Sequence, residues 1–549
     1  MKYRRIGRAM IVFALLCVGF TAQADSTDAV VASASKAVVS VDSGKLQGFI
    51  RNGIYTYRGV PYAQAARFMM PEKVTPWEGI RGAMNYGAIC PMPPMADVAG
   101  DEMFNPHRYL PQNENCQFLN IWTPGIQDNQ KRPVMVWIHG GAFTNGSSIE
   151  QLAYDGENLS KKGDVVVVSL NHRLNVLGYF DLSAYGEQYK QSANVGVADM
   201  VAALEWIKAN IAQFGGDPEN VTLFGQSGGG GKILTLMATP AAKGLFHKAI
   251  VQSGTFPGMG MTLIEPKASR RVAEFTLANL GLKPEQVSEL QKMPYLQLLD
   301  ASNKALAQTA EEQKISGLFG GFSLMWAPVV DGEYIPVHPV GAEFAAQAKD
   351  IPLMIGTVLN EFNTIIINNP VALEANNKNA WTTEQAQAEL TKKYGDKAES
   401  VGKAFLEAYP DKKLADAYFI DTLVRPGTIA TAQLKADQQG APVYSYVFTY
   451  ESPVMDGVGM AWHCAEIPYI FNNAGLVDSA TGGGDAAFAL ADKMSLAWIH
   501  FARSGNPNHS RLPEWPAFTR DNGATMIFDN LCVVRNHHDE QLMNILTSK

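Results

Sequence analysis

The chain has 549 residues, 46% of them hydrophobic, and its 53 acidic residues outnumber its 45 basic ones. This composition is sufficient for a large buried core. The formal net charge of −8 argues against nucleic acid or an anionic membrane surface as the partner, because both of these attract basic proteins.

The first 24 residues read as a secretory signal peptide. A basic start and an apolar run over 9–20 come before a small-x-small cleavage pattern at 22–24. That run is too short to span a bilayer comfortably, and no later apolar run reaches the roughly 18 residues of a membrane-spanning helix. We therefore expect a bacterial protein exported to the periplasm or secreted, with residues 25–549 as a single domain. An uncleaved anchor and a two-domain chain are the alternatives.

Six apolar runs predict buried, parallel β-strands. They are rich in valine and isoleucine and do not alternate with polar residues, as expected when helices cover both faces of a sheet. A helical pattern over 197–214 lies between two of them, and residues 267–320 and 380–435 are rich in helix formers. The pattern predicts an α/β fold with a mostly parallel central sheet, helices on both faces and helical insertions that form a cap. The six runs are 133–140, 164–171, 220–225, 248–254, 351–357 and 442–448.

A serine among glycines follows the run at 220–225. The stretch 224–233, FGQSGGGGKI, does not fit a Walker phosphate loop, because Gln226 stands where the first glycine is needed and Ile233 follows the lysine. The dinucleotide spacing Gly-x-Gly-x-x-Gly is not met in this turn either. Residues 225–229 instead match Gly-x-Ser-x-Gly, the sharp strand-to-helix turn that exposes a nucleophile, here Ser227.

A second glycine-rich turn ends the run at 133–140. The sequence HGGAF, residues 139–143, is similar to the HGGG-type loop whose backbone N–H groups point into an active site. We expect the N–H groups of Gly141, Ala142 and Gly228 to form an oxyanion hole. An ordinary turn is the alternative for this segment.

With both motifs in place, the chain resembles the type-B carboxylesterases, the α/β-hydrolase family that includes the cholinesterases. The resemblance runs from about residue 39 to residue 528. It implies hydrolysis of small-molecule carboxylic esters without a metal or organic cofactor, and two structural ion pairs, Arg67–Glu114 and Arg173–Asp199. The segments that carry it are YRGVPYAQ (57–64), NENCQFLNIWTP (113–124), FGGDPENVTLFGQSGGG (214–230), WAPVVDG (326–332) and HFARSGNPN (500–508).

Four cysteines lie outside the predicted leader, and in an exported protein they allow three pairings. The resemblance implies a Cys90–Cys116 disulfide. Cys464 could pair with Cys532, but a buried free thiol at Cys464 is the preferred interpretation.

Some positions depart from the family pattern. Gln226 and Gly228 flank the serine where the family usually has Glu and Ala, and Asn115 replaces an Asp. Because the donor at 228 is a backbone N–H, glycine preserves it. No Trp lies between Cys90 and Cys116, where cholinesterases carry their choline-stacking ring, so a cationic choline ester is not the expected substrate.

The remaining triad members come from the resemblance and from chain order. His463, in WHCAEIPY, resembles the family's catalytic histidine segment, and Glu361, in GTVLNEFN (356–363), matches the triad glutamate. Asp331 and Glu333 are rivals for the acid, although Asp331 reads better as a turn residue. We expect Ser227 to attack an ester, with His463 as the base that Glu361 orients.

Two further positions, Phe322 and Leu324, line an acyl pocket by resemblance, with plain core packing as the alternative. The histidines and cysteines show no zinc-ligand spacing. The predicted function is therefore a serine carboxylesterase. A specialised aryl or feruloyl esterase or a lipase of the same chemistry is the closer alternative, and an inactive cholinesterase-like binding protein the more distant one.

Overall fold

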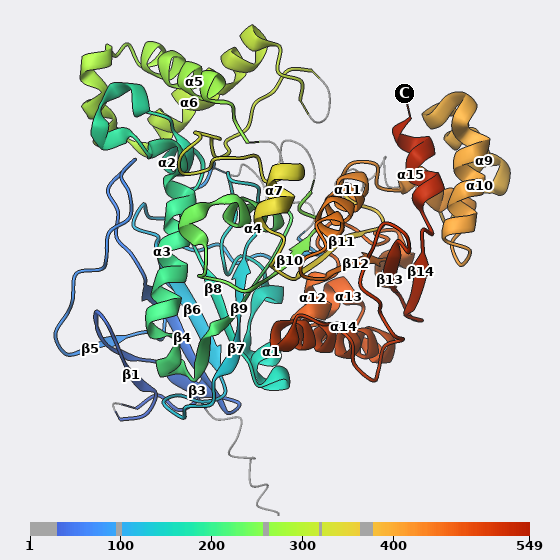
Figure 1. The fold of residues 1–549 in the computed structure, drawn as a ribbon, viewed down its shortest axis with the longest axis horizontal. Coiled ribbons are helices and arrows are strands. Elements are labelled where there is room, and N and C mark those ends of the chain that lie inside the picture. The colour runs from blue at the N-terminus through green and yellow to red at the C-terminus, as the bar shows by residue number, and fades with distance from the viewer. Residues whose placement is uncertain are drawn as a thin grey trace, which may run out of the picture.

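The computed structural model describes residues 30–33, 35–94, 102–255, 263–317, 321–362 and 377–548. These residues form an 11-stranded sheet with the order β14-β13-β12-β11-β10-β9-β7-β8-β6-β4-β3 (Figure 1). The strands are β3 (Phe49–Arg51), β4 (Ile54–Pro61), β6 (Phe118–Thr123), β7 (Arg132–Ile138), β8 (Val166–Leu170), β9 (Gly216–Gln226), β10 (Lys248–Gln252), β11 (Leu353–Val358), β12 (Val443–Phe448), β13 (Ala524–Phe528) and β14 (Val533–Asn536).

All six predicted strands are present, as β7 to β12. Neighbours from β8 through to β13 in the sheet order pair in parallel, and antiparallel strands flank them on both sides. The predicted α/β class with a mostly parallel sheet is confirmed. Since the carboxyl ends of parallel strands share one edge, the loops after β7, β9, β11 and β12 are brought to the same side of the sheet.

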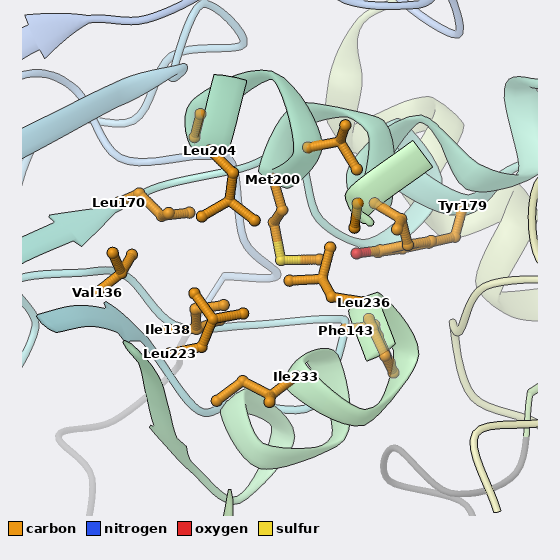
Figure 2. Close-up of a cluster of buried hydrophobic side chains, with 14 of the residues drawn as sticks. Val136, Ile138, Phe143, Leu170, Tyr179, Met200, Leu204, Leu223, Ile233 and Leu236 are labelled. Atoms are coloured by element: carbon orange, nitrogen blue, oxygen red, sulfur yellow. The ribbon is translucent and has the colours of Figure 1, made fainter. Parts of the chain in front are cut away.

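Strand β7 shows why the predicted strands do not alternate. Val136 and Ile138 belong to the hydrophobic core on one face of the sheet, whereas Met135 and Trp137 belong to a second core on the other face. Figure 2 shows the first core, in which side chains of β7, β8 and β9 meet those of the covering helices. Both faces are therefore apolar because both are buried.

Helices cover the two faces. On one lie α3 (Val195–Asn210), the core of the predicted helix 197–214, and α4 (Gly228–Ala238), with Met200, Leu204 and Ile233 turned to the sheet (Figure 2). The other face is covered by α12 (Ile467–Ile470) and α14 (Gly484–Ser504), through side chains such as Trp498. This is the helix-on-both-faces arrangement that the sequence predicts.

The two stretches rich in helix formers are helical, and the first helices of each lie far apart in the molecule (Figure 1). The first contains α5 (Pro266–Asn279) and α6 (Tyr295–Gln313), which pack together above α2 (Asn175–Tyr179). The second is split. Helices α9 (Thr383–Tyr394) and α10 (Ala398–Ala408) lie near α15 (Glu540–Thr547), whereas α11 (Val424–Asp437) packs on β11 and β12.

The remaining regular elements are short. A small sheet joins three strands near the amino terminus. These strands and the other short helices are β1 (Val38–Val41), β2 (Gly44–Gln47), β5 (Ile80–Gly82), α1 (Glu157–Gly163), α7 (Ala342–Gln347) and α13 (Asp478–Thr481).

The Cys90–Cys116 disulfide is present and closes a sequence separation of 26 residues. No disulfide joins Cys464 to Cys532; Cys464 is half-buried and Cys532 is buried. A disulfide is typical of an oxidising compartment. The predicted signal peptide lies outside the described residues, and none of the described helices combines the length and the apolar character needed to cross a membrane.

Both ion pairs implied by the resemblance are formed. Arg173 binds Asp199 through two hydrogen bonds, Nη2 to Oδ1 at 2.6 Å and Nε to Oδ2 at 2.8 Å, and both side chains are buried. Arg67 binds Glu114 in the same two-pronged way. These pairs fix loops at the periphery of the parallel sheet, consistent with a role in the fold.

Candidate active site

Ser227 lies on a sharp turn between β9 and α4. Its φ of 57° is unusual for a residue other than glycine and is a conformation typical of functional sites. Its backbone N–H donates to Gln252 O at 2.8 Å, which ties the turn to β10. A Cβ at Gly225 or Gly229 would collide with the carbonyl oxygen of Ile138, so only glycine allows the turn to lie this close to β7.

The loop after β7 lies directly against this turn. Gly141 and Ala142 have φ values of 78° and 50°, and Gly141 O accepts the N–H of Asn145 at 2.9 Å. A Cβ at Gly228 would overlap the N and Cα atoms of Ala142. Among the described residues, no acceptor takes the amide N–H of Gly141 or Ala142. The structure thus brings the three predicted oxyanion residues together, two of them with unused donors.

His463 and Glu361 meet at the ends of two neighbouring strands. Glu361 follows β11, and its Oε2 is hydrogen-bonded to Nδ1 of His463, while its Oε1 accepts the N–H of Val358 at 3.2 Å. The preceding residue, Asn360, donates its backbone N–H to Ala461 O at 3.0 Å and accepts the Ala461 N–H with its side-chain Oδ1 at 3.3 Å. These contacts hold the carboxylate and the imidazole in one orientation.

The residue before the serine connects the two halves of the site. Gln226 Nε2 lies 3.2 Å from Nε2 and 3.4 Å from Nδ1 of His463, and its Oε1 accepts from Cys464 Sγ at 3.1 Å. The ring of Phe362 stacks on His463 with centroids 4.4 Å apart. The imidazole therefore lies between the side-chain amide of Gln226, the residue before Ser227, and the ring of Phe362.

Three carboxyl groups surround the imidazole electrostatically. Burial alone would lower the pKa of His463, but the charge of Glu361 and its hydrogen bond outweigh burial and raise the pKa, with Glu466 and Asp421 adding to this. Burial, together with the charge of Glu361, raises the pKa of Glu466 to about 7 and that of Asp421 to about 7. The neighbouring carboxyl groups thus stabilise the imidazolium form that His463 takes when it accepts a proton.

The rival acids have other roles. Asp331 Oδ1 accepts the backbone N–H groups of Glu333, Tyr334 and Ile335, so it stabilises a turn as the sequence indicated. Glu333 is exposed and pairs with Lys190. Neither occupies the position at His463 that Glu361 holds.

The two predicted pocket residues differ from each other. Phe322 is 54% exposed, whereas Leu324 is partly buried against the main core. Their assignment to an acyl pocket stays a prediction. Among the described residues, no three His, Cys, Asp or Glu side chains come together in a way that could hold a metal ion.

A family model described as the carboxylesterase family matches residues 35–545. The chain belongs to the carboxylesterase family. The para-nitrobenzyl esterase of Bacillus subtilis (strain 168) is 34% identical over 513 residues, which cover 92% of this chain and 97% of that relative. The phenmedipham hydrolase of Pseudarthrobacter oxydans is 32% identical, covering 90% and 95% of the two chains.

A solved structure agrees with this assignment. An esterase from Clostridium hathewayi, described as able to hydrolyze aliphatic aromatic polyesters, is 41% identical with a TM-score of 0.85, and the match covers 94% of this chain and 99% of that one. This carboxylesterase therefore shares both sequence and fold with ester hydrolases along almost its whole length. It is a carboxylic ester hydrolase.

Sequence reasoning missed several residues of the carboxylesterase site. Asn360 and Glu466 stand one and three positions from predicted site residues, so their neighbourhood was a usable signal. The only pattern that involves Lys232 is the Walker phosphate loop, which the sequence does not match. Asp421 lies in a segment without any motif, and only the packing of that segment against Leu359 brings it near Glu361.

Proposed function

We propose that this enzyme is a serine carboxylesterase that works through a Ser227–His463–Glu361 triad and an acyl-enzyme intermediate. His463 takes the proton of the Ser227 hydroxyl as the oxygen attacks the ester carbonyl, and then protonates the leaving alcohol. A water molecule, deprotonated by His463 in turn, releases the acid from Ser227. Glu361 fixes the imidazole tautomer and stabilises its charged form.

The observation that carries this proposal is the hydrogen bond between Glu361 and His463, whose imidazole contacts Gln226, the residue before Ser227. The raised pKa of His463 supports the role of a proton acceptor, since the buried carboxylate offsets the cost of charging a buried ring. Gln226, which contacts the ring with its side chain and carries Ser227 next to it, supports the pairing of serine and histidine.

The amides of Gly141, Ala142 and Gly228 receive the oxyanion in this mechanism. Backbone donors that are already in place cost no reorganisation when charge develops on the carbonyl oxygen, and each is worth about 3–4 kcal/mol in the transition state. Gly228 lies so close to Ala142 that it leaves no room for a Cβ, and Gly141 has a positive φ. Both features support this assignment, because they bring the two turns together.

The proposed substrates are small carboxylic esters, including esters with an aromatic group. The names of two relatives, the para-nitrobenzyl esterase and the polyester-hydrolysing esterase, mention aromatic compounds. The disulfide supports the expected export of the enzyme to an oxidising compartment. Phe322 and Leu324 remain the candidates for an acyl pocket.

Hydrolysis of p-nitrophenyl esters of increasing chain length, p-nitrobenzyl acetate and a terephthalate diester by wild type and Ser227→Ala tests the proposal. The variant is expected to fold and to lose at least about a thousandfold in kcat, because it lacks the nucleophile. Ser495→Ala removes a buried serine whose hydrogen bonds to described residues all lie within α14; it is the matched control and should keep its rate. Near-normal turnover by folded Ser227→Ala would refute the triad.

A further inference from the structure

Lys232 is a fully buried lysine immediately behind the loop after β7. It lies in α4, five residues after Ser227, and its side chain is 0% exposed. Its Nζ donates to His139 O at 2.9 Å and to Gly140 O at 3.2 Å. In the described part of the chain it forms no ion pair, so both hydrogen bonds of this buried group go to two successive backbone carbonyls. Burial of such a group is costly unless these bonds are formed.

The second of these carbonyls belongs to a peptide that matters for the reaction. Gly140 C=O and Gly141 N–H are the two ends of one planar trans peptide, so they point in opposite directions. Holding the oxygen towards Lys232 therefore turns the Gly141 N–H away from Lys232. A hydrogen bond to a carbonyl also polarises its peptide and strengthens the N–H of the same unit as a donor.

This loop needs such support because its backbone is strained. Gly141 and Ala142 both have positive φ, which only a surrounding structure that over-determines the loop can maintain. Neighbours of Gly140 O contribute as well, since His139 Nδ1 lies 2.9 Å from it. Of these two contacts, only that of Lys232 links the loop to the helix that begins at Ser227.

We propose that Lys232 is a positioning residue for ester hydrolysis, which holds the Gly140–Gly141 peptide so that the Gly141 amide faces the developing oxyanion. The inference rests on the oxyanion hole of the proposed function, and it names the side chain that orients one of its donors. Lys232 touches neither the ester nor Ser227 in this role. It acts through the backbone.

The charge state of Lys232 does not decide this role. Burial lowers its pKa to about 7, against the opposing charge of Glu150. Either an ammonium or an amine group keeps enough N–H donors for two carbonyls. Nearby, His139 and His172 stack with centroids 5.2 Å apart, and burial lowers the pKa of both well below the usual range, so they contribute no positive charge to the loop.

Lys232→Met tests the role, because methionine keeps the length of the side chain and removes its donors. We expect kcat to fall about a hundredfold, the effect typical of losing one oxyanion donor, with KM within about threefold of wild type. Affinity for a trifluoromethyl ketone, whose adduct carries an oxyanion, should fall by the same factor as kcat/KM. Affinity for a non-reactive amide analogue of the substrate should stay unchanged.

The chain offers a matched control in Lys435. It is also 0% exposed and also donates to two backbone carbonyls, of Lys349 at 2.9 Å and Ala441 at 3.5 Å, but it lies on α11 away from the predicted site residues. Lys435→Met should lower the melting temperature as Lys232→Met does, while kcat and ketone affinity remain at the wild-type level.

Three results would overturn the inference. One is a kcat of Lys232→Met within threefold of wild type, and another is a loss of kcat without a matching loss of ketone affinity. The third is a loss of kcat or of ketone affinity in Lys435→Met as large as in Lys232→Met. If Lys232→Met does not fold, Lys232→Gln replaces it. Its shorter side chain is expected not to reach both carbonyls, so the same losses are expected, and a kcat within threefold of wild type again overturns the inference. Ser227→Ala in the same assay separates the hypotheses: if it is inactive while Lys232→Met is normal, only the positioning role fails.

Discussion

The two sides of the site use different chemical groups, backbone amides on one side and titratable side chains on the other. On the side of β7 and β9, the proposed oxyanion donors beside Ser227 are backbone amides, and glycines packed without room for a Cβ bring them together. On the side of β11 and β12, they are side chains, with one imidazole among three buried carboxyl groups. The backbone side is rigid because its geometry is set by sterics, whereas the side-chain side responds to pH because its groups titrate.

This difference teaches how each side can fail. A substitution leaves the peptide N–H in place, so the backbone side is disrupted by displacing its amides. Adding a Cβ to one of its glycines is enough to do this. Removing a single charge breaks the side-chain side, since the imidazole depends on its carboxylate neighbours. Three substitutions probe this contrast, from the largest expected effect to the smallest.

The largest effect is expected for Glu361→Gln, on the side-chain side. The amide can still accept the N–H of Val358, so the fold should persist, but it cannot stabilise a charged His463. We expect kcat to fall about 10³- to 10⁴-fold, as measured in steady-state hydrolysis of a p-nitrophenyl ester.

The rival acid provides the control for this variant. Asp331→Asn alters a turn and the hydrogen bond that Asp331 accepts from Asn194, so it should leave kcat unchanged with a small loss of stability. A large loss in Asp331→Asn together with normal turnover in Glu361→Gln would move the acid role to the other carboxylate.

On the backbone side, Gly228→Ala should lower kcat about a hundredfold. The added Cβ would overlap the N and Cα of Ala142, so the two turns must separate and the donors with them. The type-B carboxylesterases that this chain resembles usually have alanine here, which makes the variant a direct test of the close approach. The melting temperature should fall as well.

A helical glycine elsewhere is the matched control for Gly228. In α10, a Cβ at Gly402 would meet Leu414 Cδ1 at 2.8 Å, the mobile end of a side chain that can turn aside. Gly402→Ala should keep its rate and change the stability by less than about 1 kcal/mol. If Gly228→Ala is as active as Gly402→Ala, the backbone side is less rigid than we infer.

The smallest effect is expected for Glu466→Gln, which changes the pH dependence. The proposed mechanism requires neutral His463, so kcat/KM should fall as the pH drops through the raised pKa of this histidine. Removing the negative charge of Glu466 should move this acid limb to lower pH by roughly half a unit. An unchanged limb would show that Glu361 alone sets the pKa of His463.

Stability measurements on the same variant check the sign. Because the pKa of Glu466 is raised to about 7 in the folded protein, its contribution to the free energy of unfolding is fully present below its unfolded-state pKa and is lost as the pH rises through about 7. Glu466→Gln lacks this loss. In urea titrations, the unfolding free energy of Glu466→Gln minus that of wild type should therefore increase as the pH rises from 5 to 8.

Much of this molecule was predictable from local pattern. The strands around Val136 and Val168 were found because buried parallel strands are continuously apolar, and the Ser227 turn was found because it requires small neighbours. The disulfide and both structural ion pairs came from the resemblance to a family. These features depend on short stretches of sequence or on motifs, so they can be predicted without knowing which distant residues come into contact.

The amino-acid sequence by itself determined the α/β class and the positions of the two glycine turns, because side-chain periodicity and the absence of Cβ atoms act on the local backbone. Only the tertiary structure decided that Glu361 rather than Asp331 binds His463, that Asp421 and Glu466 add their charges there, and that Lys232 holds the loop at Gly140. Those contacts join residues from separate strands and loops. Their energies depend on distance and burial, which arise when the sheet assembles and not from neighbours along the chain.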